Sequence, residues 1–93
     1  MAGNLDTLRK EIEDIDARIA ELIDQRTRVA EDVARVKMEQ DLPIVNPQAE
    51  ERVHERYRKA AERYGLREET MVSVARLLIS EAVFREEEIA RRP

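Results

Sequence analysis

Arg26 is a cation placed among apolar residues in a helical pattern. Its neighbours three and four positions away are Leu22, Ile23, Val29 and Ala30, so no acid on the adjacent turns can neutralise it. An unpaired charge on a buried face costs several kcal/mol unless an anion compensates it. Arg26 therefore predicts an anion from a ligand, from another helix or from a second chain.

Three further ionisable residues have an unusual setting. Lys37 follows Arg26 by 11 residues, at almost the same helical azimuth and roughly 16 Å along the axis. Glu86 has only apolar neighbours three and four positions away, and Glu50 lies on the inner line of a later helical stretch. Cations that converge in this way suit a small polyanion held by its carboxylates. These residues are our candidates for a binding or catalytic site.

Arg9 lies on the same inner line as Arg26 and Lys37, but far from both. It precedes Lys37 by 28 residues, roughly 42 Å along one continuous helix. Asp6 and Glu13 are within its reach, which favours a structural ion pair for Arg9 taken alone. If Arg9 joins the site, it must come from a partner chain.

Other kinds of catalysis find little support in the sequence. There is no cysteine, no glycine-rich phosphate loop and a single histidine, His54, on a charged helical stretch. One imidazole is neither a metal-ligand set nor a positioned base, so we expect His54 to be exposed and inert. The sequence predicts no metal and no covalent catalysis.

These residues lie on an all-helical chain that is too elongated to cover itself. Residues 5–40 contain no Gly or Pro and would form one helix roughly 54 Å long, several times the radius of gyration of about 12 Å for a compact chain of this size. We therefore expect an obligate homodimer. Apolar residues recur at spacings of three and four, at Leu5, Leu8, Ile12, Ile15, Ile19, Leu22, Val29 and Val33.

Two shorter helices follow, and the 93 residues form one domain. Asn46-Pro47 is typical of an N-cap followed by proline in the first turn, and Gly65 of a left-handed C-terminal cap. They predict a second helix over 47–64, and apolar periodicity predicts a third over 69–90. The architecture is a long, a short and a medium helix.

The charge and hydropathy of the chain limit its partners. A net charge of −4 without a lysine-rich run argues against nucleic acid. No apolar run approaches membrane-spanning length, and residues 1–4 are too short and polar for a signal peptide. We expect a cytoplasmic protein that does not bind membranes.

One set of residues follows the pattern of a known family: Leu8-Arg9-Lys10-Glu11-Ile12-Glu13-Asp14-Ile15-Asp16, Leu22 to Arg26, Ala30, Val33, Lys37 and Pro43-Ile44. With these residues the chain resembles, over residues 5–89, the all-helical type II class of chorismate mutase. That class forms an intertwined homodimer of three-helix chains and rearranges chorismate to prephenate, a step in phenylalanine and tyrosine biosynthesis, without a cofactor.

The resemblance implies a role for each candidate. Arg26 and the partner's Arg9 would hold the two carboxylates, Lys37 would stabilise charge on the breaking ether oxygen, and Glu50 would bind the ring hydroxyl. Asp16 would orient either the helix interior or Arg9, without needing to touch the substrate.

Glu86 stands where many members of the family have a glutamine that donates a hydrogen bond to the ether oxygen. A carboxylate cannot donate, so Glu86 would have to be protonated, which an apolar setting favours. We therefore predict activity that falls as pH rises.

Three other positions depart from the family pattern near the substrate. Asn46 replaces a common Asp, Ala49 a common Arg and Ala82 a common small polar residue. The changes are either neutral drift or signs of another substrate, 4-amino-4-deoxychorismate, because the lost arginine would ease acceptance of a cationic amine.

Two further alternatives remain open at this stage. Isochorismate pyruvate lyases share the fold and similar cations, although Leu42-Pro43-Ile44 resembles the mutases. A helical dimerisation or regulatory module without activity is the non-enzymatic alternative, and it predicts a protein carboxylate as the partner of Arg26.

Overall fold

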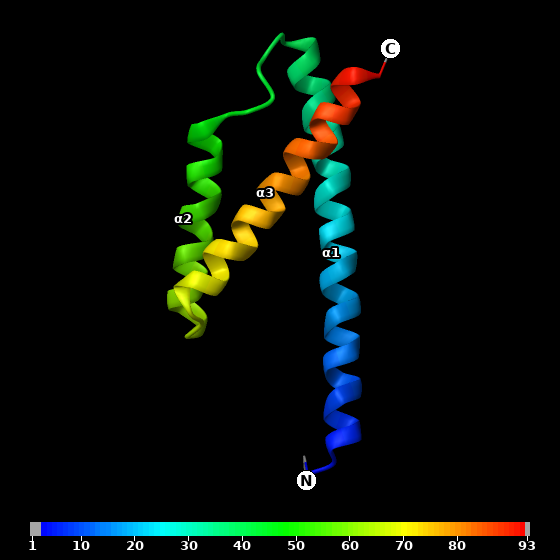
Figure 1. Ribbon diagram of the computed structural model, residues 1–93, viewed down its shortest axis with the longest axis vertical. Coiled ribbons are helices and arrows are strands. Elements are labelled where there is room, and N and C mark those ends of the chain that lie inside the picture. The colour runs from blue at the N-terminus through cyan, green and yellow to red at the C-terminus, as the bar shows by residue number, and fades with distance from the viewer. Residues whose placement is uncertain (1–2, 93) are drawn as a thin grey trace.

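The computed structural model describes residues 3–92, and within that range the chain is all-helical. Three helices follow in the order predicted, α1 (Leu5–Glu39), α2 (Pro47–Tyr64) and α3 (Glu68–Arg91) (Figure 1). Residues 1, 2 and 93 lie outside the described residues. The expectation that residues 1–4 are not a signal peptide therefore falls partly outside them. The all-helical fold class is therefore confirmed, with α1 ending one residue early and α3 extended by one residue at each end.

Local capping sets the ends of α1. The Asn4 side chain accepts hydrogen bonds from the backbone N–H groups of Asp6 at 2.9 Å and Thr7 at 3.4 Å, which satisfies donors that the first turn leaves free. After Glu39 the chain turns at Asp41, whose φ of 56° lies in the left-handed region that Asp tolerates better than most residues. The turn redirects the chain toward α2.

The caps of α2 are those that the sequence predicts. Asn46 is the N-cap, with Pro47 in the first turn, and Gly65 is the C-cap in the left-handed conformation at φ 65°. The backbone N–H of Gly65 donates to the carbonyl of Ala61, which closes the last turn. These signals are local, so the bounds of α2 follow from the sequence alone.

α3 joins the other two helices. It packs against α1 and against α2, whereas α1 and α2 do not pack directly on each other. The molecule is elongated, with extents of 57 × 28 × 14 Å and a radius of gyration of 16.8 Å. In Figure 1 the N-terminal part of α1, coloured blue, runs past the ends of both other helices.

The core of the single chain is small. Among the described residues the buried apolar side chains are Ala30, Ala34, Ala61, Ala75 and Ile89, so most of them are alanines. The larger aliphatic residues of α1 stay exposed, for example Ile12 at 58% and Leu22 at 60%. Within residues 3–92, no helix is long and apolar enough to span a membrane.

Candidate active site

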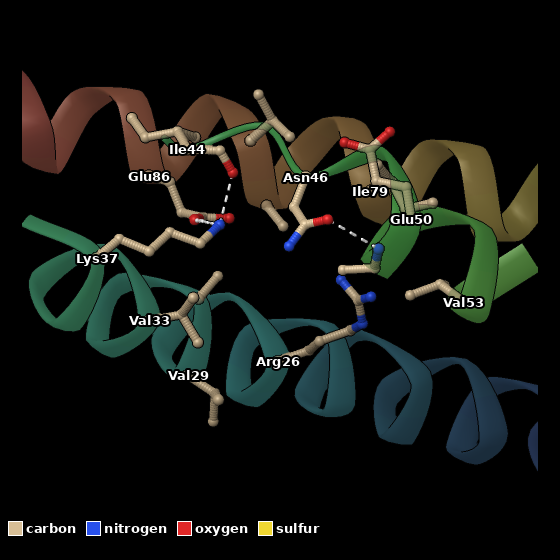
Figure 2. A pocket seen from close by; sticks show the side chains of 14 residues that line it. Arg26, Val29, Val33, Lys37, Ile44, Asn46, Glu50, Val53, Ile79 and Glu86 are labelled. Atoms are coloured by element: carbon tan, nitrogen blue, oxygen red, sulfur yellow. Dashed lines mark hydrogen bonds and ion pairs between the residues drawn. The ribbon is translucent and has the colours of Figure 1, made fainter. Parts of the chain in front are cut away.

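A cavity of about 330 Å³ lies where α1 and α2 face each other across α3. Its size falls at the lower end of the range of small-molecule sites. Figure 2 shows that its polar side chains project from all three helices and from the connection before α2. The lining residues are Arg26, Val29, Ala30, Val33, Lys37, Ile44, Asn46, Ala49, Glu50, Val53, Ile79, Ala82, Val83 and Glu86.

Lys37 and Glu86 form an ion pair at one end of the cavity. The Lys37 Nζ lies 2.8 Å from Glu86 Oε1 and also donates to the main-chain carbonyl of Ile44 at 2.5 Å (Figure 2). The side chains are 18% and 7% exposed, so both charges are largely removed from water. One ammonium thus joins α1, the connection and α3. The apolar setting predicted for Glu86 from its helical neighbours is wrong, because α3 crosses α1 beside Lys37.

Arg26 is half-buried and holds α3 through the main chain. Its Nη1 donates to the carbonyl of Leu78 at 3.1 Å. Within residues 3–92, no carboxylate lies within ion-pair distance of the guanidinium. Because guanidinium carries five N–H donors, most of its donor capacity stays available to a ligand.

The first turn of α2 forms the opposite wall. Asn46 Oδ1 accepts from the backbone N–H of Ala49 at 3.1 Å, and the Asn46 carbonyl accepts from the N–H of Glu50 at 3.0 Å. Glu50 is half-buried, and its carboxylate takes part in none of the ion pairs of the described chain. This wall therefore offers an unpaired acceptor.

The structure brings most of the predicted site residues together. Those that line the cavity are Arg26, Lys37, Asn46, Glu50, Ala82 and Glu86. Arg9 does not line it, because Arg9 is exposed in the N-terminal part of α1, roughly 26 Å along the helix from Arg26. Asp16 is exposed on that part of α1 as well, so neither residue reaches the cavity within one chain.

Two contributions to the site could not be found in the sequence. The carbonyls of Ile44 and Leu78 fix the cationic side chains, yet any residue type supplies a carbonyl, so no sequence signal marks them.

His54, which we expected to be exposed, is half-buried on α2 but does not line the cavity. The described residues contain no group of three or more His, Cys, Asp or Glu that could hold a metal ion.

Comparison with known proteins shows the family of the chain. The family model of chorismate mutase type II matches residues 8–87. A curated protein from Methanocaldococcus jannaschii named "Chorismate mutase" is 33% identical over 79 residues, which cover 85% of this chain and 80% of that protein. No solved structure matches significantly. Because the family model spans all three helices and the cavity between them, the chain belongs to the chorismate mutase type II family.

Proposed function

We propose that this chain rearranges chorismate to prephenate in the cavity between its three helices. The observation that carries the proposal is the pair of cations, Arg26 and Lys37, that face one apolar cavity with donors to spare. Chorismate has two carboxylates, an ether oxygen and a ring hydroxyl. Its rearrangement is intramolecular, so the protein contributes positioning and electrostatic stabilisation rather than a nucleophile or a cofactor.

The cations take the roles that their free donors allow. Lys37 has three N–H donors, and two of them donate to the Ile44 carbonyl and the Glu86 carboxylate. The third can donate to the ether oxygen of the substrate as negative charge grows there. Arg26 spends one on Leu78 and presents the others to a carboxylate of the substrate. Because both are tethered from another element, neither has to be ordered at the moment of reaction.

The remaining residues complete the fit to chorismate. Glu50 accepts a hydrogen bond from the ring hydroxyl, and Ala82 leaves room for the ring beside α3. Glu86 donates to the ether oxygen when it holds a proton. The same carboxylate lies 2.8 Å from the Lys37 Nζ, so Glu86 also holds the ammonium in place.

The active form in this proposal is a homodimer with shared sites. The exposed stripe on the N-terminal part of α1 supports it, because each large aliphatic side chain is worth about 1.5–3 kcal/mol when buried. A second chain that covers the stripe would also carry its Arg9 to this cavity, where the second substrate carboxylate needs a cation. The stripe consists of Leu5, Leu8, Ile12, Ile15, Ile19 and Leu22.

The pathway, the cellular compartment and the partners of the enzyme stay predictions. We propose a place in phenylalanine and tyrosine biosynthesis, in the cytoplasm, without nucleic-acid or membrane partners. Cell fractionation and growth of a mutase-deficient strain without these two amino acids would test them. A strain that still needs either amino acid after complementation would contradict the pathway.

The alternatives are weighed by the same contacts. A scaffold without activity predicts a protein carboxylate against Arg26, whereas the described residues offer a carbonyl instead. 4-Amino-4-deoxychorismate would place an ammonium near Glu50. Isochorismate pyruvate lyase would need the same cations, so product identification is what separates it from a mutase.

The test is turnover of purified protein with chorismate, isochorismate and 4-amino-4-deoxychorismate in parallel. We expect prephenate from chorismate and no pyruvate from isochorismate. Arg26→Lys should lower kcat/KM by about 100-fold, because it removes the paired donors that grip a carboxylate. Arg28→Lys is the matched control, since Arg28 is exposed on the same helix and pairs with Asp24. Absence of prephenate with the unmodified chain would overturn the proposal.

A further inference from the structure

We infer that Asp41 is a positioning residue for the rearrangement, because its left-handed backbone turns the connection so that the Ile44 carbonyl can hold the Lys37 ammonium. The inference rests on the proposed function and adds to it a residue that does not line the cavity. Asp41 is exposed, and its carboxylate takes part in none of the ion pairs or side-chain hydrogen bonds of residues 3–92. What Asp41 contributes is therefore its backbone conformation.

The turn after α1 closes on Lys37 through the main chain. The N–H of Leu42 donates to the Lys37 carbonyl at 2.8 Å, and the N–H of Asp41 donates to the Met38 carbonyl at 3.2 Å. These two hydrogen bonds form a Schellman motif, in which the residue at the position of Asp41 has to be left-handed. Glycine is the usual residue there because a β-carbon disfavours this conformation, and Asp is one of the few others that adopt it. The φ of 56° at Asp41 meets the requirement.

The side chain of Lys37 meets the same connection a few residues later. Its ammonium donates to the Ile44 carbonyl at 2.5 Å, so Lys37 binds the connection at two points, at Leu42 through its own carbonyl and at Ile44 through its side chain. Only Pro43 lies between these points, and its ring fixes φ and disfavours a helical backbone at Leu42. Little rotational freedom is left after Asp41, so the conformation of Asp41 sets where the Ile44 carbonyl points.

The Ile44 carbonyl in turn fixes the direction of the ammonium. The carbonyl and the Glu86 carboxylate accept from two of the three N–H groups of Lys37, and the direction of the third follows from the other two. In the proposed function, that third N–H stabilises charge on the ether oxygen. The contact strengthens only as the bond breaks, so misplacing it should lower kcat and leave KM almost unchanged.

The first experiment compares Asp41→Val and Asp41→Ala with Asp41→Gly. The β-branched valine disfavours the left-handed conformation most, alanine disfavours it less, and glycine adopts it freely. We expect kcat to fall about tenfold in Asp41→Val and about threefold in Asp41→Ala, with KM within about twofold, while Asp41→Gly keeps both constants within about twofold. Rates are expressed per folded chain, with the folded fraction taken from circular dichroism, and Asp41→Ala carries the test if Asp41→Val does not fold.

The second experiment follows the hydrogen bond itself and needs no activity. Ile44-Val45 is the only Ile-Val step in the sequence, so isoleucine labelled with carbonyl 13C and valine labelled with 15N give one NMR correlation for the Ile44 carbonyl. In Asp41→Val its carbonyl shift should move toward that of Lys37→Met, which has no ammonium to donate. In Asp41→Gly it should stay where it is in the unmodified chain.

Glu39→Val is the matched control. It removes one negative charge and adds the same side chain two residues earlier, but Glu39 is exposed and lies within α1, where the backbone is right-handed. We expect kcat within about twofold of that of the unmodified chain and an unmoved Ile44 signal. A control that loses as much activity as Asp41→Val would overturn the inference, because the lost charge or the valine side chain would then explain both.

The remaining outcomes separate this inference from the proposed function. An Ile44 signal that stays in place in Asp41→Val and in Asp41→Ala would overturn the inference and leave the mutase activity standing, as would a moved signal with unchanged kcat. Equal losses of kcat in Asp41→Gly and Asp41→Val would also overturn it, since the carboxylate would then matter rather than the backbone. Absence of prephenate with the unmodified chain would overturn the proposed function and, with it, the role of Asp41 in the reaction.

Discussion

The ammonium of Lys37 on α1 lies 2.8 Å from a carboxylate oxygen of Glu86 on α3, with both side chains largely buried. The pair stands at the end of the cavity that faces the connection before α2, where Lys37 also binds the Ile44 carbonyl. One contact therefore holds three segments of the chain and positions two residues proposed to act on the substrate. Its two roles, structural and chemical, can be separated by measurement.

Lys37→Met should destabilise the fold by about 1–3 kcal/mol, because it leaves a buried carboxylate without its partner. The double variant Lys37→Met/Glu86→Leu should recover most of that loss, since it removes the stranded charge and fills the space with apolar atoms. Urea unfolding followed by circular dichroism measures both free energies at fixed protein concentration. A double variant as unstable as Lys37→Met would show that the pair is not what stabilises this end of the cavity.

Arg28→Met provides the matched control for that series. Arg28 pairs with Asp24 at 3.1 Å on the same helix, but the two side chains are 74% and 60% exposed. Exposed pairs contribute little, so the free energy of unfolding should change by less than about 0.5 kcal/mol.

Activity should fall as pH rises, because Glu86 can donate to the ether oxygen only while it holds a proton. The ionisable group in contact with Glu86 is Lys37 from α1. Glu86→Gln donates at every pH and should lose much of the decline. The measurement is kcat against pH for both chains. A variant with an unchanged pH profile would exclude this role for Glu86.

Ile12→Asp should dissociate the proposed dimer, because Ile12 lies in the middle of the exposed aliphatic stripe and a buried unpaired carboxylate costs several kcal/mol. Ala17→Asp is the matched control, with the same charge on the same helix about 140° away from Ile12 around the axis. Sedimentation equilibrium should report a dimer for the unmodified chain and for Ala17→Asp, and a weakened one for Ile12→Asp. A monomeric unmodified chain would contradict the proposed assembly.

Arg9→Ala and Lys37→Ala should each be inactive, yet their mixture should regain activity. In a mixed dimer one site combines both changes, and the other has an intact Lys37 with an intact Arg9 from the partner. Random exchange at equal amounts makes half of the dimers mixed, so about one quarter of the unmodified activity should return. Subunit exchange is verified by mass spectrometry, and exchange without recovery would exclude a site shared in this way.

Helix bounds could be predicted from the sequence because their causes are local. Asn46 accepts from the backbone of the next turn, and Gly65 adopts the left-handed conformation that a β-carbon disfavours. The length of α1 follows from 35 consecutive residues without Gly or Pro. Such signals involve contacts within a few residues, which a linear pattern records.

The contacts of the cavity could not be predicted in the same way. That Lys37 meets Glu86 depends on how α3 crosses α1, because the two residues are 49 positions apart. The carbonyl of Leu78 as partner of Arg26 depends on the same crossing. The helical neighbours of Arg26, Lys37 and Glu86 correctly predict that these side chains face the interior. They do not predict which group on another segment each side chain contacts.

The departures at Asn46 and Ala49 leave the net charge near Glu50 unchanged and alter the hydrogen-bonding groups of the cavity wall. The lost arginine at Ala49 suggested room for a cationic substrate, but Asn46 removes one negative charge in place of the aspartate common in the family. The two departures cancel in net charge. What changes is the hydrogen-bond polarity of the wall, since the Asn46 amide now supplies a donor there.

The alanine-rich core has a consequence for the activity of the dilute protein. An alanine methyl contributes less than about 1 kcal/mol on burial, so a chain whose buried apolar residues are mostly alanines has little to keep it folded alone. On the proposed dimer, folding and pairing are then one event, and the active fraction rises with concentration. Diluting the protein below the dissociation constant of the proposed dimer should therefore lower its specific activity.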